Sequence, residues 1–337
     1  MKRSIIPVFI PHMGCPHRCV FCDQRQISGK RSAPDVRAEI GAALEKTERS
    51  GISVLPQVAF YGGSFTAIEE REQTEFLAVG AEFVHQGRVA SLRCSTRPDA
   101  IDGAVVQRLK KYHMQTVELG AQSMDDGVLL RAGRGHTAAD TVRAARMLKA
   151  EGFELVLQMM TGLPGDTPEK SLRTAEELIA LEPAAVRIYP TVVLPGTGLE
   201  KLWREGKYRP ETTAEAAALC GRLLGRFEEA GIPVIRLGLN PSRGLEEQVL
   251  DGPYHPAFGE LAAGELWLSR IREKLGTERR SGVVLELTVP PHAVSAAVGQ
   301  HRRNVQALQA EYGFGSVRIR AGEALSVCTV SPGKTEK

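Results

Sequence analysis

Hydrophobic positions recur with two different periods through the first two thirds of the chain. Short runs rich in β-branched and aromatic residues are each followed by a stretch in which apolar side chains recur every three or four residues. This alternation is typical of βαβ units around a parallel sheet. We expect six units, with strands at residues 4–10, 57–61, 89–94, 115–119, 154–160 and 185–189. The expected fold class is α/β, a partial (β/α)6 barrel of the TIM type.

Six units are fewer than the eight that close a full barrel, so something else must cover the open side. The region 211–268 is the candidate: a long helix at 212–230 precedes a stretch rich in Gly and Pro that is typical of an ordered loop. We therefore expect a barrel domain at 1–210, a helical and loop extension at 211–268, and a small α+β domain at 269–337.

The order of elements expected in the last domain resembles a KH fold. A strand at 283–289 is followed by two helical stretches and by strands near Val317 and Val327. A KH loop that clamps a nucleic-acid backbone has glycine at both ends, whereas here Arg302 takes the second glycine position. The resulting candidates for nucleic-acid contact are Gly299, Gln300, His301, Arg302 and Arg303.

Composition and charge narrow the function classes. With 337 residues, 42% hydrophobic and 25% charged, the chain is neither disordered nor fibrous. The N-terminal apolar run at 5–10 contains Pro7 and is too short for a membrane span, so we expect a cytoplasmic protein without a membrane partner. From Ser269 onward the chain has eleven Lys and Arg and six Asp and Glu, a net charge of +5, whereas the whole chain carries +3. Any contact with a polyanion should therefore involve the C-terminal segment.

The six cysteines are unevenly spread. Cys15, Cys19 and Cys22 fall within eight residues, which resembles a metal site in a reducing compartment more than a disulfide framework. Cys94, Cys220 and Cys328 are scattered. Cys220 lies on an apolar helical stripe and Cys328 in an alternating strand, so we expect both thiols to be buried.

Three thiolates can ligate three irons of a 4Fe-4S cluster and leave the fourth iron open. The alternative is a structural zinc site with His12 or His17 as fourth ligand. Zinc sites usually have a second pair of cysteines, and the sequence contains none nearby, so the cluster is the preferred interpretation.

The pattern Cys-x-x-x-Cys-x-x-Cys after the first strand, with the aromatic Phe21 before the last cysteine, resembles the signature of the radical S-adenosylmethionine (SAM) superfamily. The resemblance implies two cofactors, a 4Fe-4S cluster and SAM. It further implies that an electron from the cluster, supplied by a donor such as flavodoxin or ferredoxin, cleaves SAM to a 5'-deoxyadenosyl radical. The protein's task is to hold these groups and exclude water.

Further positions match this superfamily's cofactor contacts. A glycine pair after the second strand, which alone would be a tight turn, resembles the motif that contacts the methionine amino group, and Glu118 resembles a ribose or amino contact. The competing interpretation of Glu118 is a structural ion pair with Arg97. The candidates for cofactor binding are Phe21, Gly62, Gly63, Ser64, Thr96, Arg97, Glu118, Gln122, Arg134, Gln158 and Leu163.

Within the superfamily the chain resembles the catalytic third subunit of Elongator and its bacterial relatives, which modify the tRNA wobble uridine. The segments 117–123, 134–137 and 187–193 carry this resemblance. The cysteine spacing is shorter than in Elongator, and we expect no acetyltransferase domain. Coproporphyrinogen oxidases have a fourth cysteine where Gln24 stands.

Three functions remain in view from the sequence. The first is a radical SAM enzyme that modifies RNA. The second is a radical SAM enzyme acting on a small metabolite or tetrapyrrole, and the third is a non-catalytic, metal-stabilised RNA-binding module. The sequence identifies no catalytic residue beyond the cofactor ligands.

Overall fold

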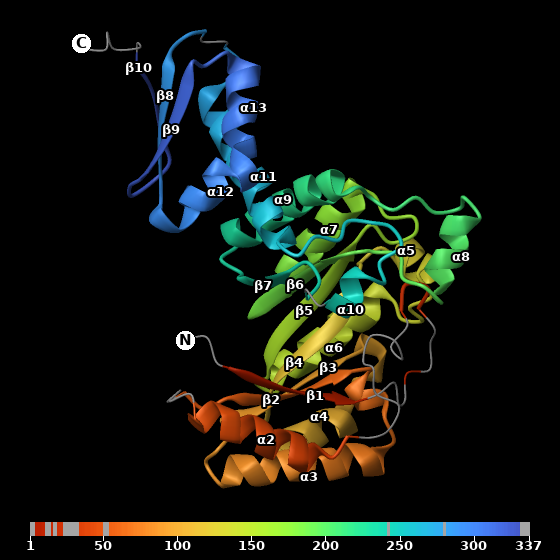
Figure 1. The fold of residues 1–337 in the computed structure, drawn as a ribbon. Coiled ribbons are helices and arrows are strands. Elements are labelled where there is room, and N and C mark those ends of the chain that lie inside the picture. The colour runs from red at the N-terminus through yellow and green to blue at the C-terminus, as the bar shows by residue number, and fades with distance from the viewer. Residues whose placement is uncertain are drawn as a thin grey trace.

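The computed structural model describes residues 4–10, 15, 19–22, 34–49, 54–240, 243–278 and 281–330. Seven parallel strands form one curved sheet in chain order, with helices on its outer face (Figure 1). The strands are β1 (Ile5–Ile10), β2 (Gln57–Gly62), β3 (Ser91–Thr96), β4 (Met114–Gln122), β5 (Glu154–Thr161), β6 (Ala185–Pro190) and β7 (Val234–Leu237). The α/β class and the partial barrel are confirmed.

The prediction of six strands was one too few. All six are present with small shifts at their ends, and β7 extends the sheet by pairing in parallel with β6. Because β7 has only four residues and follows Pro233, it is too short for a hydrophobic period to be read.

Helices connect the strands as the apolar periodicity predicts. They are α2 (Val36–Arg49), α3 (Glu70–His85), α4 (Gly103–Lys111), α5 (Asp126–Arg131), α6 (Ala138–Ala150), α7 (Pro168–Ile179) and α8 (Gly198–Arg204). At the start of α7, Thr167 accepts a hydrogen bond from the backbone N–H of Lys170, and Pro168 occupies the first turn.

The region after the barrel is more helical than expected. The long helix is present as α9 (Thr213–Glu229) and is followed by α10 (Arg243–Glu246) and α11 (Phe258–Leu275). The sequence analysis did not predict α11, and the boundary expected between residues 268 and 269 falls inside it. α9 packs beside α7, and α11 packs on α9 so closely that a Cβ at Gly221 would lie 2.8 Å from the carbonyl oxygen of Ala262.

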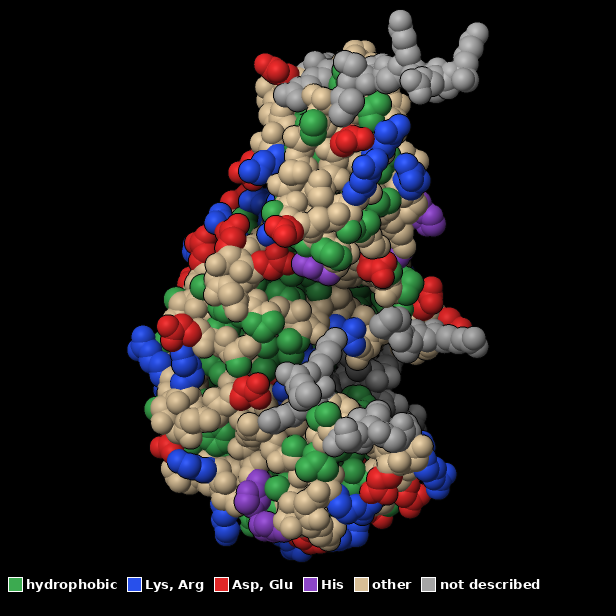
Figure 2. Space-filling model, turned by 90° about the vertical axis from the view of Figure 1, so that its left-hand side faces the viewer, with side chains coloured by type: hydrophobic (Ala, Val, Ile, Leu, Met, Phe, Trp, Pro, Cys, Tyr) green, Lys and Arg blue, Asp and Glu red, His purple; other side chains and the backbone are tan. Residues whose placement is uncertain are grey.

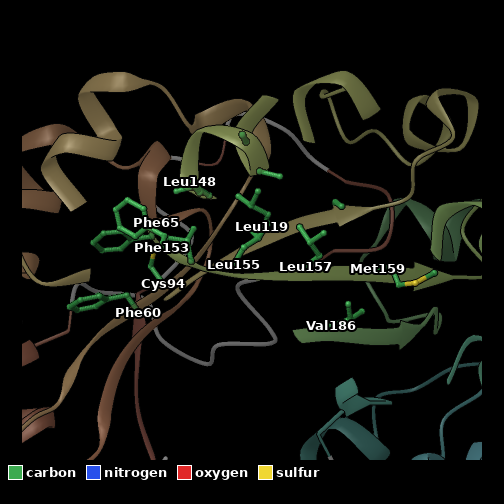
Figure 3. Packing of buried hydrophobic residues seen from close by; sticks show 14 of the residues in the cluster. Phe60, Phe65, Cys94, Leu119, Leu148, Phe153, Leu155, Leu157, Met159 and Val186 are labelled. Atoms are coloured by element: carbon green, nitrogen blue, oxygen red, sulfur yellow. The ribbon is translucent and has the colours of Figure 1, made fainter. Parts of the chain in front are cut away.

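Two hydrophobic cores hold the chain together. The larger lies between the sheet and its helices, where side chains such as Leu119, Leu157 and Val186 pack (Figure 3). The smaller joins the C-terminal unit to the end of α11, which contributes Leu268, Ile271 and Leu275. α11 therefore belongs to both cores.

The C-terminal unit has the α+β order that the sequence predicts. It contains β8 (Val284–Val289), α12 (Val294–Val298), α13 (Arg303–Tyr312), β9 (Ser316–Ala321) and β10 (Ser326–Val330), with strand order β10-β8-β9. The burial predicted for Cys328 was wrong: this residue is exposed on edge strand β10, whereas Cys220 is buried. Alternation gives two faces but not which one is covered. None of the described helices is long and apolar enough to cross a membrane.

Candidate functional site

A cavity of about 230 Å³ lies at the carboxyl ends of the strands and gathers most of the residues predicted as cofactor ligands. Two lining residues, Ser95 and Gly120, were missed. Glu118 and Leu163 lie elsewhere. The predicted residues that line the cavity are Cys15, Cys19, Cys22, Phe21, Gly62, Gly63, Ser64, Thr96, Arg97, Gln122, Arg134 and Gln158.

The described part of the cysteine segment is held between two helices. The backbone N–H of Val20 donates to the carbonyl of Ala132 at 3.0 Å, and its carbonyl accepts from Leu199 N–H at 2.6 Å. These contacts fix Cys19, which is buried, between the end of α5 and the start of α8. His12 and His17, the alternative zinc ligands, lie outside the described residues.

The described residues contain no group of three His, Cys, Asp or Glu side chains that converge on one metal ion. The thiolates of a cluster bind separate irons and need not converge on one point. Ligation of a cluster by the three cysteines stays a prediction.

Arg134 connects the cysteines to the sheet. Its Nη1 lies 3.4 Å from the sulfur of Cys19, and its Nη2 donates to the carbonyl of Gly120 at 2.7 Å. This places a positive charge beside the thiol. Arg97 donates to the carbonyl of Arg134 and pairs with Asp99 at 2.9 Å, so the predicted alternative of an Arg97–Glu118 ion pair is wrong.

Three buried polar atoms of the lining residues have no hydrogen-bond partner among the described residues. They are the Oε1 of Gln122, the Nη1 of Arg97 and the Nε of Arg134. An amide oxygen accepts from an ammonium group, and guanidinium N–H groups donate to a carboxylate. This set of one acceptor and two donors fits the amino-acid part of SAM, and buried groups of this kind are costly unless a ligand satisfies them.

Gly62 and Ser64 shape the neighbouring wall. Gly62 has a φ of +123°, and a Cβ there would lie 2.1 Å from the carbonyl oxygen of Ile10, so no other residue fits between β1 and β2. The hydroxyl of Ser64 lies 2.9 Å from that of Thr96 and accepts from the N–H of Arg97 at 3.2 Å. The ends of β2 and β3 are thereby joined at the cavity.

Glu118 lies inside the barrel, fully buried on β4, and has two arginine partners. Arg93 Nη1 contacts its Oε1 at 2.9 Å, and Arg187 Nε contacts its Oε2 at 2.9 Å. The sequence analysis missed both arginines, although a charged residue inside an apolar strand is a usable signal of a buried ion pair.

Two neutral side chains complete the shell of Glu118. Tyr61 donates to Oε1 at 2.8 Å and Gln158 donates to Oε2 at 2.9 Å. Burial raises the pKa of Tyr61, and the Glu118 carboxylate raises it further, so the phenol stays protonated. Gln158 also lines the cavity, so it connects the buried Glu118 to that site.

A second and larger cavity, of about 730 Å³, lies between the β5–α7 turn, α5, α8 and the start of α9. Leu163 is among its lining residues, together with Arg131, Asp166, Lys207 and Glu211. Burial raises the pKa of Glu211, the nearby Asp166 carboxylate raises it as well, and together they bring it to about 7.

This raised pKa makes stability depend on pH. Between pH 4.5 and about 7 the Glu211 carboxyl is protonated to a larger extent in the folded protein than in the unfolded chain. The free energy of unfolding therefore falls as the pH rises through this range. Glu211→Gln, which imitates the protonated form, should leave stability nearly unchanged at pH 5. At pH 8 it should raise the free energy of unfolding by about 1–2 kcal/mol, since partial exposure reduces the full linkage value.

Denaturant unfolding of both proteins at the two pH values checks this expectation. The same difference between variant and parent at pH 5 and pH 8 would contradict it.

Comparison with known proteins places this geometry in a family. Residues 9–178 match the model of the Radical SAM superfamily, and residues 183–267 match that of the Radical SAM C-terminal domain. An uncharacterised protein of Methanocaldococcus jannaschii is 31% identical over 216 residues, which are 60% of this chain and 66% of that protein. A tRNA uridine(34) acetyltransferase of Dehalococcoides mccartyi is 38% identical over 128 residues, or 37% of this chain and 28% of that protein.

A solved structure, the archaeal Methanocaldococcus infernus Elp3 with its N-terminus deleted, has the same fold. Its TM-score is 0.62 at 22% identity, over 81% of this chain and 63% of that one. The chain thus spans no more than about two thirds of the length of these relatives. Members of the matched superfamily use a 4Fe-4S cluster and SAM. The chain belongs to the radical SAM superfamily.

Proposed function

We propose that the protein is a radical SAM enzyme that modifies RNA, with a uridine of tRNA as the substrate type. This proposal is supported by the similarity to proteins named for tRNA uridine(34) acetylation, together with the cavity at the carboxyl ends of the strands that gathers the predicted cofactor ligands. We further propose a cytoplasmic location and a protein electron donor such as flavodoxin or ferredoxin.

Different residues around the smaller cavity would bind the cluster and SAM. Cys15, Cys19 and Cys22 would ligate the cluster, and Arg134 would offset its charge. Arg97 and Gln122 would bind the carboxylate and ammonium groups of SAM through the atoms that lack partners in the described part of the chain. When bound, the two cofactors would supply a 5'-deoxyadenosyl radical within this cavity.

The remaining predicted ligands would hold the rest of SAM. Gly62 and Gly63 let the backbone approach the ligand closely, and Ser64 with Thr96 fixes the strand ends beside it. Phe21 offers an aromatic wall, and Gln158 is oriented by the buried Glu118. Leu163 belongs to the small apolar cluster against which Phe21 packs, and would support that side chain.

RNA would also contact the C-terminal unit, whose Lys and Arg side chains are visible at the top of Figure 2. The turn before α13 is the candidate, because His301 and Arg302 are exposed there and both have left-handed backbone conformations (φ 51° and 61°). Behind it, Asn304 is buried and donates to the carbonyl of Gly264 on α11 at 2.8 Å. A pinned turn with an exposed arginine side chain is suited to phosphate contacts.

The proposal is tested with protein purified and reconstituted without oxygen. Dithionite and SAM are added, and 5'-deoxyadenosine is measured with and without bulk tRNA. We expect tRNA to stimulate product formation, and we expect Arg302→Ala to weaken tRNA binding and reduce its salt slope by about 1.

Arg71→Ala, at an exposed position on α3, serves as the matched control and should change neither quantity. If tRNA does not change the rate of SAM cleavage and the protein binds no tRNA at low salt, the proposal of an RNA substrate is refuted. A small molecule is then the alternative substrate.

A further inference from the structure

The larger cavity lies beside the cofactor cavity but is separate from it. The two have no lining residue in common. Leu163 lines the larger cavity, is 2% exposed, and belongs to a small apolar cluster against which Phe21 of the smaller cavity packs. A ligand in the larger cavity would therefore lie next to the reaction without touching the reacting groups.

Two ionisable side chains of opposite sign in this cavity, Arg131 and Glu211, form no ion pair with each other. Within the described part of the chain, Arg131 at the end of α5 has no ion pair, and the one hydrogen bond that Glu211 accepts is a long one of 3.4 Å from the hydroxyl of Thr161. The other charges are satisfied within the chain, as in the pairs Arg209–Glu215 and Lys207–Glu205, both at 2.8 Å. The cavity thus offers one cationic and one acidic group to a ligand.

The glycines of the turn at residues 162–165 lie close to both of these side chains. A Cβ at Gly162 would lie 2.8 Å from Glu211 Oε2, and one at Gly165 would lie 2.5 Å from Arg131 Nη1. Both glycines have positive φ, 72° and 79°. The backbone therefore leaves space for the carboxylate at one end of the turn and for the guanidinium at the other.

We propose that this cavity binds one nucleotide of the RNA substrate, with the phosphate on Arg131 and an N–H or hydroxyl group donating to Glu211. A nucleotide carries both kinds of group, a guanidinium suits a phosphate through paired hydrogen bonds, and about 730 Å³ is ample for a ligand of this size.

This inference rests on the proposed function and specifies one part of it. Because Leu163 and Phe21 separate the cavity from the cofactor site, the nucleotide bound here is a neighbour of the modified one. Its role would be to fix the position of the RNA relative to the radical. Arg131 and Glu211 are then positioning residues for the substrate.

The test is calorimetric titration of the reconstituted, full-length protein without oxygen, using uridine 5'-monophosphate, uridine and inorganic phosphate. We expect the nucleotide to bind more tightly than either fragment. Arg131→Gln should weaken nucleotide binding about tenfold, the value of one charge-assisted contact, and leave uridine binding as it was. Glu211→Gln should weaken nucleotide and uridine alike.

Arg71→Gln, an exposed arginine on α3, is the matched control and should bind all three ligands as the parent does. Nucleotide binding no tighter than phosphate binding, or no change in Arg131→Gln, would overturn the inference. Titration does not depend on turnover. If the nucleotide binds as expected but tRNA does not stimulate SAM cleavage, the RNA-modifying function is rejected and the nucleotide site is retained. If tRNA stimulates SAM cleavage but the nucleotide does not bind as expected, the nucleotide site is rejected and the RNA-modifying function is retained.

Discussion

Replacing Cys19 by alanine is expected to prevent cluster assembly and to bring SAM cleavage down to background. Three thiolates are the fewest that can hold the cluster with one iron free, so no spare ligand remains. Cys19 is 6% exposed and lies beside Arg134, which makes replacement by solvent ligands unfavourable. Iron and sulfide content, visible absorbance and 5'-deoxyadenosine yield measure the effect.

Cys328→Ala is the control for this experiment, because that thiol is exposed on β10, far along the chain from the cysteine segment. It should retain iron and activity. A Cys19→Ala protein that keeps a full cluster, or a parent protein that binds one zinc and no iron, would contradict the assignment of the cysteines.

Replacing Glu118 by leucine is expected to lower the free energy of unfolding by about 3–5 kcal/mol, the usual cost of leaving a buried charge without its partner. Arg93 and Arg187, 8% and 15% exposed in their side chains, would each lose a contact of 2.9 Å. Denaturant titration measures the loss, and SAM affinity should fall with it because Gln158 loses its acceptor.

A surface pair provides the comparison. Arg37 and Glu82 also form a short ion pair, but their side chains are about half exposed, so Glu82→Gln should cost less than about 1 kcal/mol. Equal costs for the two substitutions would mean that Glu118 is better hydrated than its burial indicates.

The sequence predicted those features that depend on local periodicity and spacing. Six strands and the C-terminal unit follow from hydrophobic patterns within single segments. Most of the cofactor cavity was also predictable, because parallel strands bring their carboxyl ends to one edge and motifs after successive strands meet there.

Features that depend on pairing between distant strands were not predictable. Glu118 was expected to contact the cofactor or Arg97, yet its partners come from β3 and β6, and their identity follows from the curvature of the sheet. The larger cavity was missed for the same reason, since Arg131 and Glu211 are 80 positions apart in the sequence. α11 was missed because its apolar residues serve two cores and show no single stripe.

The shared helix α11 means that the C-terminal unit is not a detachable module. Its first half is seated on the barrel and its last turns complete the interior of the small unit through Leu268, Ile271 and Leu275. A chain cut after Gly282 would leave these side chains bare to water and prone to self-association. Substitutions in the exposed turn at His301 and Arg302, which leave that interior whole, are therefore the sound way to separate RNA binding from folding.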